Sequence, residues 1–278
     1  MTNIVRISRP RFWLYLFGPY LVGLAAGASS RSDLLRFDSI LFGLYFFLPA
    51  NLLVYGVNDI FDFETDRLNP KKVEYEMLVQ PETHRALWIW IAVLNLPFIA
   101  AVIILAGGSL PTLAAFLLVA IFYSAPPVRA KQIPFLDSLF NILYILPGVF
   151  AFQMLTGNLP PLGVIVAAAF WTAAMHAYSA IPDIEADRAA SVATIATLLG
   201  KTGTLTFCLG AFVAAAIFAH PYLGFVATVL CLVYVSMIAV SIAGEKNDHV
   251  FAVYKYFPLI NAGAGLALFW FVAISNLL

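Results

Sequence analysis

The sequence has very few charged residues for its length. Only 11% of its 278 residues are Asp, Glu, Lys or Arg, whereas 62% are hydrophobic. Soluble domains have about 25% charged and about 45–50% apolar residues, and the mean hydropathy here is +0.92. This composition excludes a soluble globular domain and indicates an integral membrane protein. We expect no nucleic-acid partner.

Cysteine and histidine are also scarce. Cys208 and Cys231 lie in apolar stretches without a CxxC motif, so we interpret them as small core residues. None of the histidines has the spacing of metal ligands; they are His84, His176, His220 and His249. His176 lies among aromatic residues and either lines a pocket or packs in the core, and we favour packing. No Ser or Cys lies in a nucleophile motif.

Apolar runs of spanning length predict an all-α polytopic fold with nine transmembrane helices. The predicted helices are 12–28, 37–57, 86–106, 110–124, 138–156, 161–181, 203–219, 221–243 and 253–276. Turns are expected at 107–108, 157–158 and 220–221, and longer polar connections follow the other helices. We expect residues 1–278 to form a single transmembrane domain.

Lysine and arginine are distributed unevenly between the two sides that these helices define. With the N-terminus inside, 13 of the 15 basic residues lie in inner segments, and only Arg31 and Arg36 lie outside. The positive-inside rule therefore predicts a multi-pass protein of the plasma membrane with a cytoplasmic N-terminus.

Four carboxylates are concentrated in residues 58–67, directly after an apolar run. If the preceding helix continues, Asn58, Asp62 and Asp66 recur at i, i+4 and i+8, and Asp59 lies three residues before Asp62. The aspartates then share one helix face. Oxygen ligands suit a hard cation, and Mg²⁺ in particular combines one or two carboxylates with substrate phosphate oxygens.

A second acidic cluster contains Asp183 and Asp187, again at i, i+4. Arg67 and Arg188 directly follow the two clusters. A solvated loop at the membrane edge would explain one such cluster, but two of them predict a shared site for Mg²⁺ and a diphosphate. A cation transporter is disfavoured, because its carboxylates would lie near helix midpoints and not at cytoplasmic ends.

Basic residues of the cytoplasmic connections are candidate phosphate ligands. Arg129 and Lys131 follow Tyr123 in the loop between the predicted fourth and fifth helices, where they could bind phosphate oxygens. They could equally be ordinary basic residues that anchor the cytoplasmic ends of the helices, as the positive-inside rule describes. Lys71 has the same two interpretations.

These motifs resemble the UbiA superfamily of intramembrane prenyltransferases. The resemblance rests on Asn58-Asp59-x-x-Asp62-x-x-x-Asp66, Asp183-x-x-x-Asp187, the Tyr123-Ser-Ala-Pro loop, Ser8-Arg9-Pro10 and the nine spans. It implies a helical bundle around a central cavity. It also implies that the aspartates of both motifs are catalytic, binding Mg²⁺ and the diphosphate of an allylic donor: Asp59, Asp62, Asp66, Asp183 and Asp187. The implied diphosphate ligands are Asn58, Arg67, Lys71, Tyr123, Arg129, Lys131 and Arg188.

One position departs from this family's pattern, because Pro127 stands where the Tyr-x-x-x-Lys motif of the loop has lysine. Arg129 or Lys131 would substitute for it. Within the superfamily the motifs are most similar to lycopene elongases, which implies transfer from dimethylallyl diphosphate to a carotenoid reached from the membrane. The alternative is an aromatic acceptor of quinone biosynthesis. Protein partners cannot be inferred.

Overall fold

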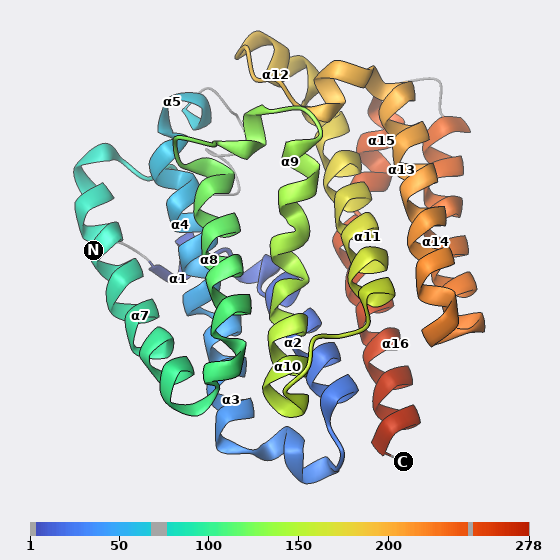
Figure 1. Cartoon of the computed structure of the whole chain (residues 1–278). Helices are drawn as coiled ribbons and strands as arrows, with labels where there is room; N and C mark the ends of the chain where they lie inside the picture. The colour runs from blue at the N-terminus through green and yellow to red at the C-terminus, as the bar shows by residue number, and fades with distance from the viewer. Residues whose placement is uncertain (1–3, 68–76, 244–246, 278) are drawn as a thin grey trace. The chain divides into compact units, whose positions relative to one another are not determined.

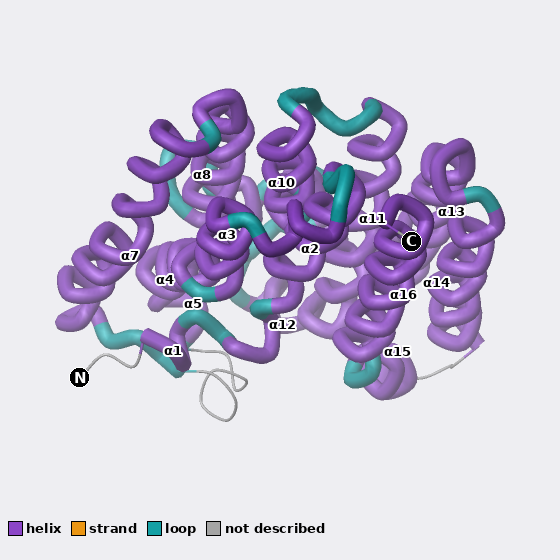
Figure 2. Tube along the Cα trace, turned by 90° about the horizontal axis from the view of Figure 1, so that it is seen from below, coloured by secondary structure: helices purple, strands orange, loops and turns teal. Residues whose placement is uncertain are grey.

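A computed structural model of the chain describes residues 4–67, 77–243 and 247–277. These residues form α-helices and short 3-10 helices joined by loops, and they contain no strand (Figures 1 and 2). The prediction of an all-α fold is confirmed. The chain divides into two compact units, which are described separately: unit 1 comprises Met1–Arg129, Leu146–Leu159 and Phe269–Leu278, and unit 2 comprises Ala130–Ile145 and Pro160–Leu268.

Unit 1 begins with a short helix and contains most of the first half of the chain. Its helices are α1 (Ile4–Ile7), η1 (Pro10–Phe12), α2 (Leu14–Gly27), η2 (Arg31–Leu35), α3 (Phe37–Phe47), α4 (Pro49–Phe61), α5 (Phe63–Asp66), η3 (Pro81–Thr83), α7 (His84–Leu105), η4 (Gly107–Ser109), α8 (Leu110–Ser124) and α10 (Leu146–Thr156). Aromatic rings fill its core: Phe46 of α3 meets Phe116 of α8 and Phe150 of α10, both with ring centroids 5.6 Å apart.

The contact between α2 and α10 is close because both helices have glycine there. A Cβ atom built on Gly23 would overlap the carbonyl oxygen of Gly148, and one on Gly148 would lie 2.7 Å from the carbonyl oxygen of Pro19. Small residues of this kind let membrane helices approach backbone to backbone. This contact fixes the helix that follows the arginine-containing N-terminal segment.

Unit 2 is built around a second, separate core. Its helices are η5 (Ala130–Gln132), α9 (Leu136–Leu139), η6 (Phe140–Tyr144), α11 (Leu162–Ala180), η7 (Ile181–Asp183), α12 (Ile184–Ala189), α13 (Ile195–Leu223), α14 (Phe225–Ala243), α15 (Asn247–Tyr254) and the first part of α16 (Phe257–Leu277). Helix α11 packs along α13, and α13 packs along α14. Phe212 of α13 and Tyr234 of α14 stack with centroids 4.5 Å apart.

The predicted number of nine spans is not confirmed. In the described residues, seven helices are long and apolar enough to cross a membrane, or eight if the bent pair Leu136–Tyr144 and Leu146–Thr156 is one span. The predicted span 12–28 contains only the 14-residue α2, because the chain before it folds into the separate η1. Large apolar side chains such as Ile103 and Ile104 of α7 are exposed, as expected for lipid-facing helices.

Two predicted boundaries are wrong. The turn expected at His220-Pro221 lies later, because α13 continues to Leu223 and ends at Gly224, whose φ of 52° suits glycine. Lys255, which was placed inside the last predicted span, lies between α15 and α16.

Candidate active site

The first acidic motif lies where α4 ends. The helix extends beyond the predicted end at residue 57 but does not continue through the whole motif. It stops at Phe61, Asp62 follows with φ −106° and ψ 2°, and the short α5 begins at Phe63. Asp59 and Asp62 are only 3% and 4% exposed. Buried carboxylates are costly unless other groups compensate their charge, so their neighbours define the site.

Asp62 is held by an amide and a guanidinium. Asn58, one turn earlier on α4, donates from Nδ2 to Asp62 Oδ2 at 2.7 Å and also contacts Ser124 Oγ of α8 at 3.1 Å. Arg129 Nη2 lies 3.5 Å from Asp62 Oδ1 and donates to the carbonyl oxygen of Phe61 at 3.2 Å. The predicted residues Asn58, Asp62 and Arg129 therefore meet at one point of unit 1.

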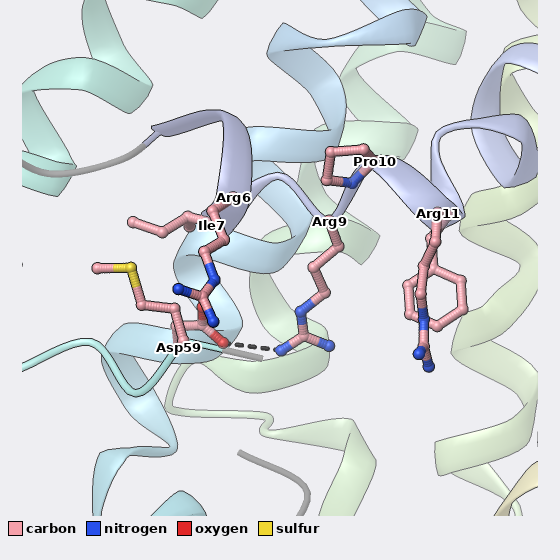
Figure 3. A pocket seen from close by; sticks show the side chains of 8 residues that line it. Arg6, Ile7, Arg9, Pro10, Arg11 and Asp59 are labelled. Carbon is pink, nitrogen blue, oxygen red and sulfur yellow. Dashed lines mark hydrogen bonds and ion pairs between the residues drawn. The ribbon is translucent and has the colours of Figure 1, made fainter. Parts of the chain in front are cut away.

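Asp59 faces a small pocket of about 130 Å³ (Figure 3). Arg9 donates from Nη2 to Asp59 Oδ1 at 2.8 Å, and its guanidinium lies 4.8 Å from the ring centroid of Tyr55. Arg6 also points toward Asp59, whereas Arg11 points away and lies over the Phe12 ring. The pocket is lined by Arg6, Ile7, Arg9, Pro10, Arg11, Phe12, Asp59 and Met77. Its three arginines and single aspartate give it an excess of positive charge, which suits an anion.

The two arginines that pair with these aspartates share an unusual backbone conformation. Arg9 has φ 52° and Arg129 has φ 46°. Residues other than glycine are uncommon at positive φ, and such strain is concentrated at functional sites. Sequence analysis identified Arg129 but did not identify Arg9 as a ligand, although the Ser8-Arg9-Pro10 motif marks its position.

The second acidic motif lies in unit 2, just beyond the end of α11 (Figure 1). Asp183 is the last residue of η7 and Asp187 lies in α12, and both are partly exposed. Arg188 does not join them in this structure, because its Nη2 donates to the carbonyl oxygen of Thr197 at 3.1 Å. Lys131 also belongs to unit 2, where it lies in η5.

One predicted ligand near the first motif, Arg67, contacts another residue in this structure. Arg67 instead pairs with Glu64 at 3.0 Å on the exposed surface, because the two residues are three apart and face the same way. The side chain of Asp66 and all of Lys71 lie outside the described residues. Tyr123, which ends α8 beside Ser124, is partly buried.

The chain matches a known protein family. The profile of the UbiA prenyltransferase family matches residues 16–257. A lycopene elongase/hydratase of Haloferax volcanii is 40% identical over 263 residues, covering 94% of this chain and 85% of the relative. A lycopene elongase/hydratase of Halobacterium salinarum is 44% identical over 214 residues, covering 77% of each chain.

Solved structures agree on the fold. A UbiA homolog from Archaeoglobus fulgidus, bound to DMAPP and Mg²⁺, superposes with a TM-score of 0.72 at 19% identity, covering 97% of this chain and 99% of that one. Helices long enough to span a membrane, together with the family match, identify a multi-pass membrane enzyme of the prenyltransferase class. The chain belongs to the UbiA prenyltransferase family.

The donor atoms in unit 1 fit the Mg²⁺ that this family implies. Asp59 and Asp62 supply hard carboxylate oxygens three residues apart, and Mg²⁺ usually binds one or two carboxylates together with substrate phosphates. No group of three Asp, Glu, His or Cys side chains poised for a metal occurs among the residues that the structure describes.

Proposed function

We propose that the protein transfers a dimethylallyl group from dimethylallyl diphosphate to a carotenoid of the lycopene type, with Mg²⁺ as cofactor. Relatives at 40% and 44% identity, both named lycopene elongase/hydratase, support the acceptor. The observation that carries the proposal is the buried pair Asp59 and Asp62, each beside an arginine. Such a pair can exchange its arginine contacts for a metal and a diphosphate.

Each side chain has a role in this proposal. The acidic residues that would hold the ion are Asp59, Asp62, Asp66, Asp183 and Asp187. The diphosphate would be bound by Asn58, Arg67, Lys71, Tyr123, Arg129, Lys131 and Arg188, to which we add Arg9. When bound, Mg²⁺ stabilises the negative charge that develops on the leaving diphosphate. Arg9 and Arg129 can each offer a planar fork of donors to phosphate oxygens.

The chemistry needs an apolar site for the acceptor. The allylic C–O bond breaks with its electron pair leaving on the diphosphate, and a π-bond of the acceptor forms the new C–C bond. Helices α2, α3, α4, α8, α10, α11, α14 and α16 contain no Lys or Arg. A carboxylated aromatic acceptor inside an apolar cavity would need a charge partner, whereas a hydrocarbon needs none.

The proposal also covers where the protein lies in the cell and how it is oriented in the membrane. We infer one transmembrane domain in the plasma membrane, with the N-terminus and both acidic motifs on the cytoplasmic side. The supporting observation is the distribution of basic residues. Of the 15 Lys and Arg residues, 13 lie in segments that the nine predicted spans place on the inner side. Soluble allylic diphosphate would then enter from the cytoplasm, and the acceptor from the bilayer.

The test supplies purified protein, Mg²⁺ and dimethylallyl diphosphate with one acceptor at a time: lycopene, 4-hydroxybenzoate or 1,4-dihydroxy-2-naphthoate. We expect an elongated carotenoid from lycopene, no prenylated aromatic acid, and no product when a chelator is in excess. Prenylation of an aromatic acid with lycopene unchanged would reject the carotenoid acceptor. Full activity in chelator would reject the metal.

A further inference from the structure

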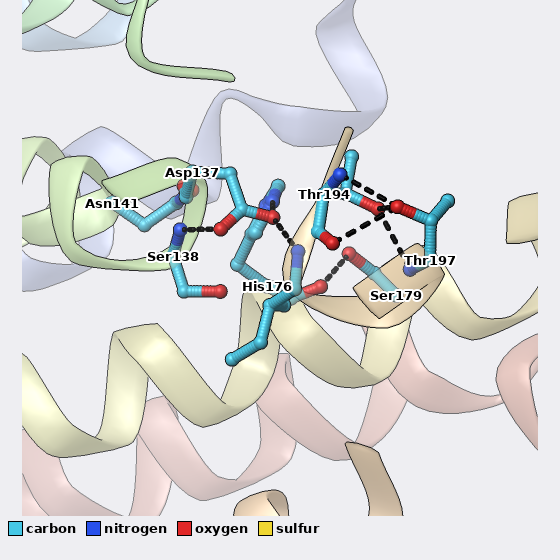
Figure 4. A network of polar contacts seen from close by, with 8 residues as sticks. Asp137, Ser138, Asn141, His176, Ser179, Thr194 and Thr197 are labelled. Carbon is cyan, nitrogen blue, oxygen red and sulfur yellow. Dashed lines mark hydrogen bonds and ion pairs between the residues drawn. The ribbon is translucent and has the colours of Figure 1, made fainter. Parts of the chain in front are cut away.

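Unit 2 contains a buried carboxylate that belongs to neither acidic motif. Asp137, in the first turn of α9, is 0% exposed. Its Oδ1 accepts from the backbone N–H of Ser138 at 2.8 Å, and its Oδ2 accepts from that of Ile195, the first residue of α13, at 2.9 Å (Figure 4). These contacts hold the carboxylate in one orientation.

A histidine lies against the same carboxylate. His176 of α11 has its Nε2 3.7 Å from Asp137 Oδ2, and its side chain is 18% exposed (Figure 4). Asp137 accepts a hydrogen bond from the first residue of α13. This contact accounts for the burial of Asp137, so the burial does not require His176. A histidine on a membrane-spanning helix is costly without a polar partner and usually marks a functional position. His176 therefore has one ring nitrogen near a carboxylate that is held in place, and part of its side chain is exposed.

His176 lies on α11, and the end of this helix leads into the second acidic motif. His176, Ser179 and Asp183 follow one another at i, i+3 and i+7, and all three are partly exposed. Their immediate neighbours Ala177, Tyr178 and Ala180 are buried in the unit. Along α11 and the following η7, at roughly 1.5–2 Å per residue, His176 lies on the order of 10 Å from Asp183.

This distance matches the place where a proton acceptor is needed. If Asp183 helps to hold the diphosphate, the dimethylallyl carbons and the end of the acceptor extend from it toward the membrane interior. Bond formation leaves a positive carbon on the acceptor, beyond the carbon that joined. A base about two helical turns below the diphosphate anchor could reach a water molecule beside that carbon.

We propose that His176, oriented by Asp137, is the base that activates water in a hydration step ending the reaction. The inference rests on the proposed function. The oxygen of water gives an electron pair to the positive carbon and forms a C–O bond, while the imidazole takes one water proton and becomes imidazolium. The product is an elongated tertiary alcohol, and the diphosphate has already left with the electrons of its C–O bond. Without the base, the cation loses a proton from carbon and an alkene forms.

The test compares His176→Gln with His220→Gln, the same change at an exposed histidine of unit 2. Products from lycopene and dimethylallyl diphosphate are separated into hydroxylated and dehydrated elongated carotenoids. We expect the hydroxylated fraction to fall about 100-fold in His176→Gln, within the usual contribution of a general base, while His220→Gln keeps the parental ratio. Added imidazole should restore the alcohol in His176→Ala.

Asp137→Asn tests the positioning role. It keeps an oxygen that can accept from Ile195 N–H, and we expect a smaller loss of alcohol that imidazole does not restore. An unchanged alcohol-to-alkene ratio in His176→Gln would overturn the proposal, as would a parental enzyme that makes only alkene. If the parental enzyme elongates no carotenoid, the proposed function fails instead. Loss of all product in His176→Ala without rescue, in protein that still binds the donor, would also count against the base.

Discussion

At the scale of single residues, the site is a set of charges that compensate one another before any substrate binds. Asp59 pairs with Arg9 and Asp62 lies near Arg129. The acidic residues could be predicted because their spacing is local. Arg9 could not be identified, because its partner is 50 positions away and only tertiary folding brings them together. Arg67, which stays a predicted diphosphate ligand, pairs in this structure with its sequence neighbour Glu64.

Replacing Asp62 with asparagine should abolish transfer and leave the fold intact, because the change removes a negative charge without changing shape. Several kcal/mol of charge stabilisation at the leaving diphosphate correspond to a loss of about 100-fold or more in kcat. Glu64→Gln is the control, because Glu64 has 73% of its side chain exposed in the same segment. Comparable rates for the two variants would contradict a role for Asp62 in catalysis.

Replacing Arg9 with glutamine should weaken donor binding. Its guanidinium contacts the buried Asp59 and lines the pocket, so the change removes a positive charge from the place where we propose that the diphosphate binds. We expect KM for dimethylallyl diphosphate to rise about tenfold, which is about 1.4 kcal/mol. Arg11→Gln is matched to it, because Arg11 lies over Phe12 and away from Asp59. Equal KM values in both variants would contradict a ligand role for Arg9.

At the scale of elements, helix positions were easier to predict than helix ends. Hydrophobic periodicity and composition predicted 110–124, and α8 spans Leu110–Ser124. The same signals began the first span at residue 12, because the apolar run starts with Phe12, which the structure places in η1 and not in α2. At the break, Asp62 contacts Asn58, which the local i, i+4 spacing contains, and Arg129, which lies far along the chain and appears in no local pattern.

The contact between α2 and α10 gives a prediction at this scale. Gly23→Ala adds a methyl group where the carbonyl oxygen of Gly148 lies, so the helices must separate. We expect a loss of about 1–3 kcal/mol in stability, measured as a lower unfolding midpoint in detergent. Gly18→Ala, on the same helix with no atom within 4 Å of the added carbon, should be neutral or slightly stabilising. Equal midpoints for the two variants would mean that this close approach is absent in the membrane.

At the scale of the whole molecule, composition alone was enough to predict a helical membrane protein. The order of elements was not enough to predict the two units, because α10 belongs to unit 1 although the segments on both sides of it belong to unit 2. The unit that α10 joins depends on which helices have complementary surfaces. The glycines of α2 and α10 are an example.

Orientation is the prediction that belongs to the whole molecule. In a background without Cys208 and Cys231, a cysteine at Glu82 should react with a membrane-impermeant thiol reagent only from the cytoplasmic side. One at Asn158 should react only from outside; both positions are exposed in loops or at a helix end. Residue 69, in the same connection as Glu82, lies outside the described residues. The reverse labelling pattern would place the acidic motifs outside the cell.

The ion pair between Arg9 and Asp59 has a consequence for biogenesis. The N-terminal segment leaves the ribosome first, but its arginine gains its carboxylate partner only after α4 has been made, 50 residues later. A buried carboxylate is costly without a charge partner, and Arg9 and Asp59 meet only through tertiary folding. The contact that ties the N-terminal segment to the acidic motif can therefore form only after α4 has been made.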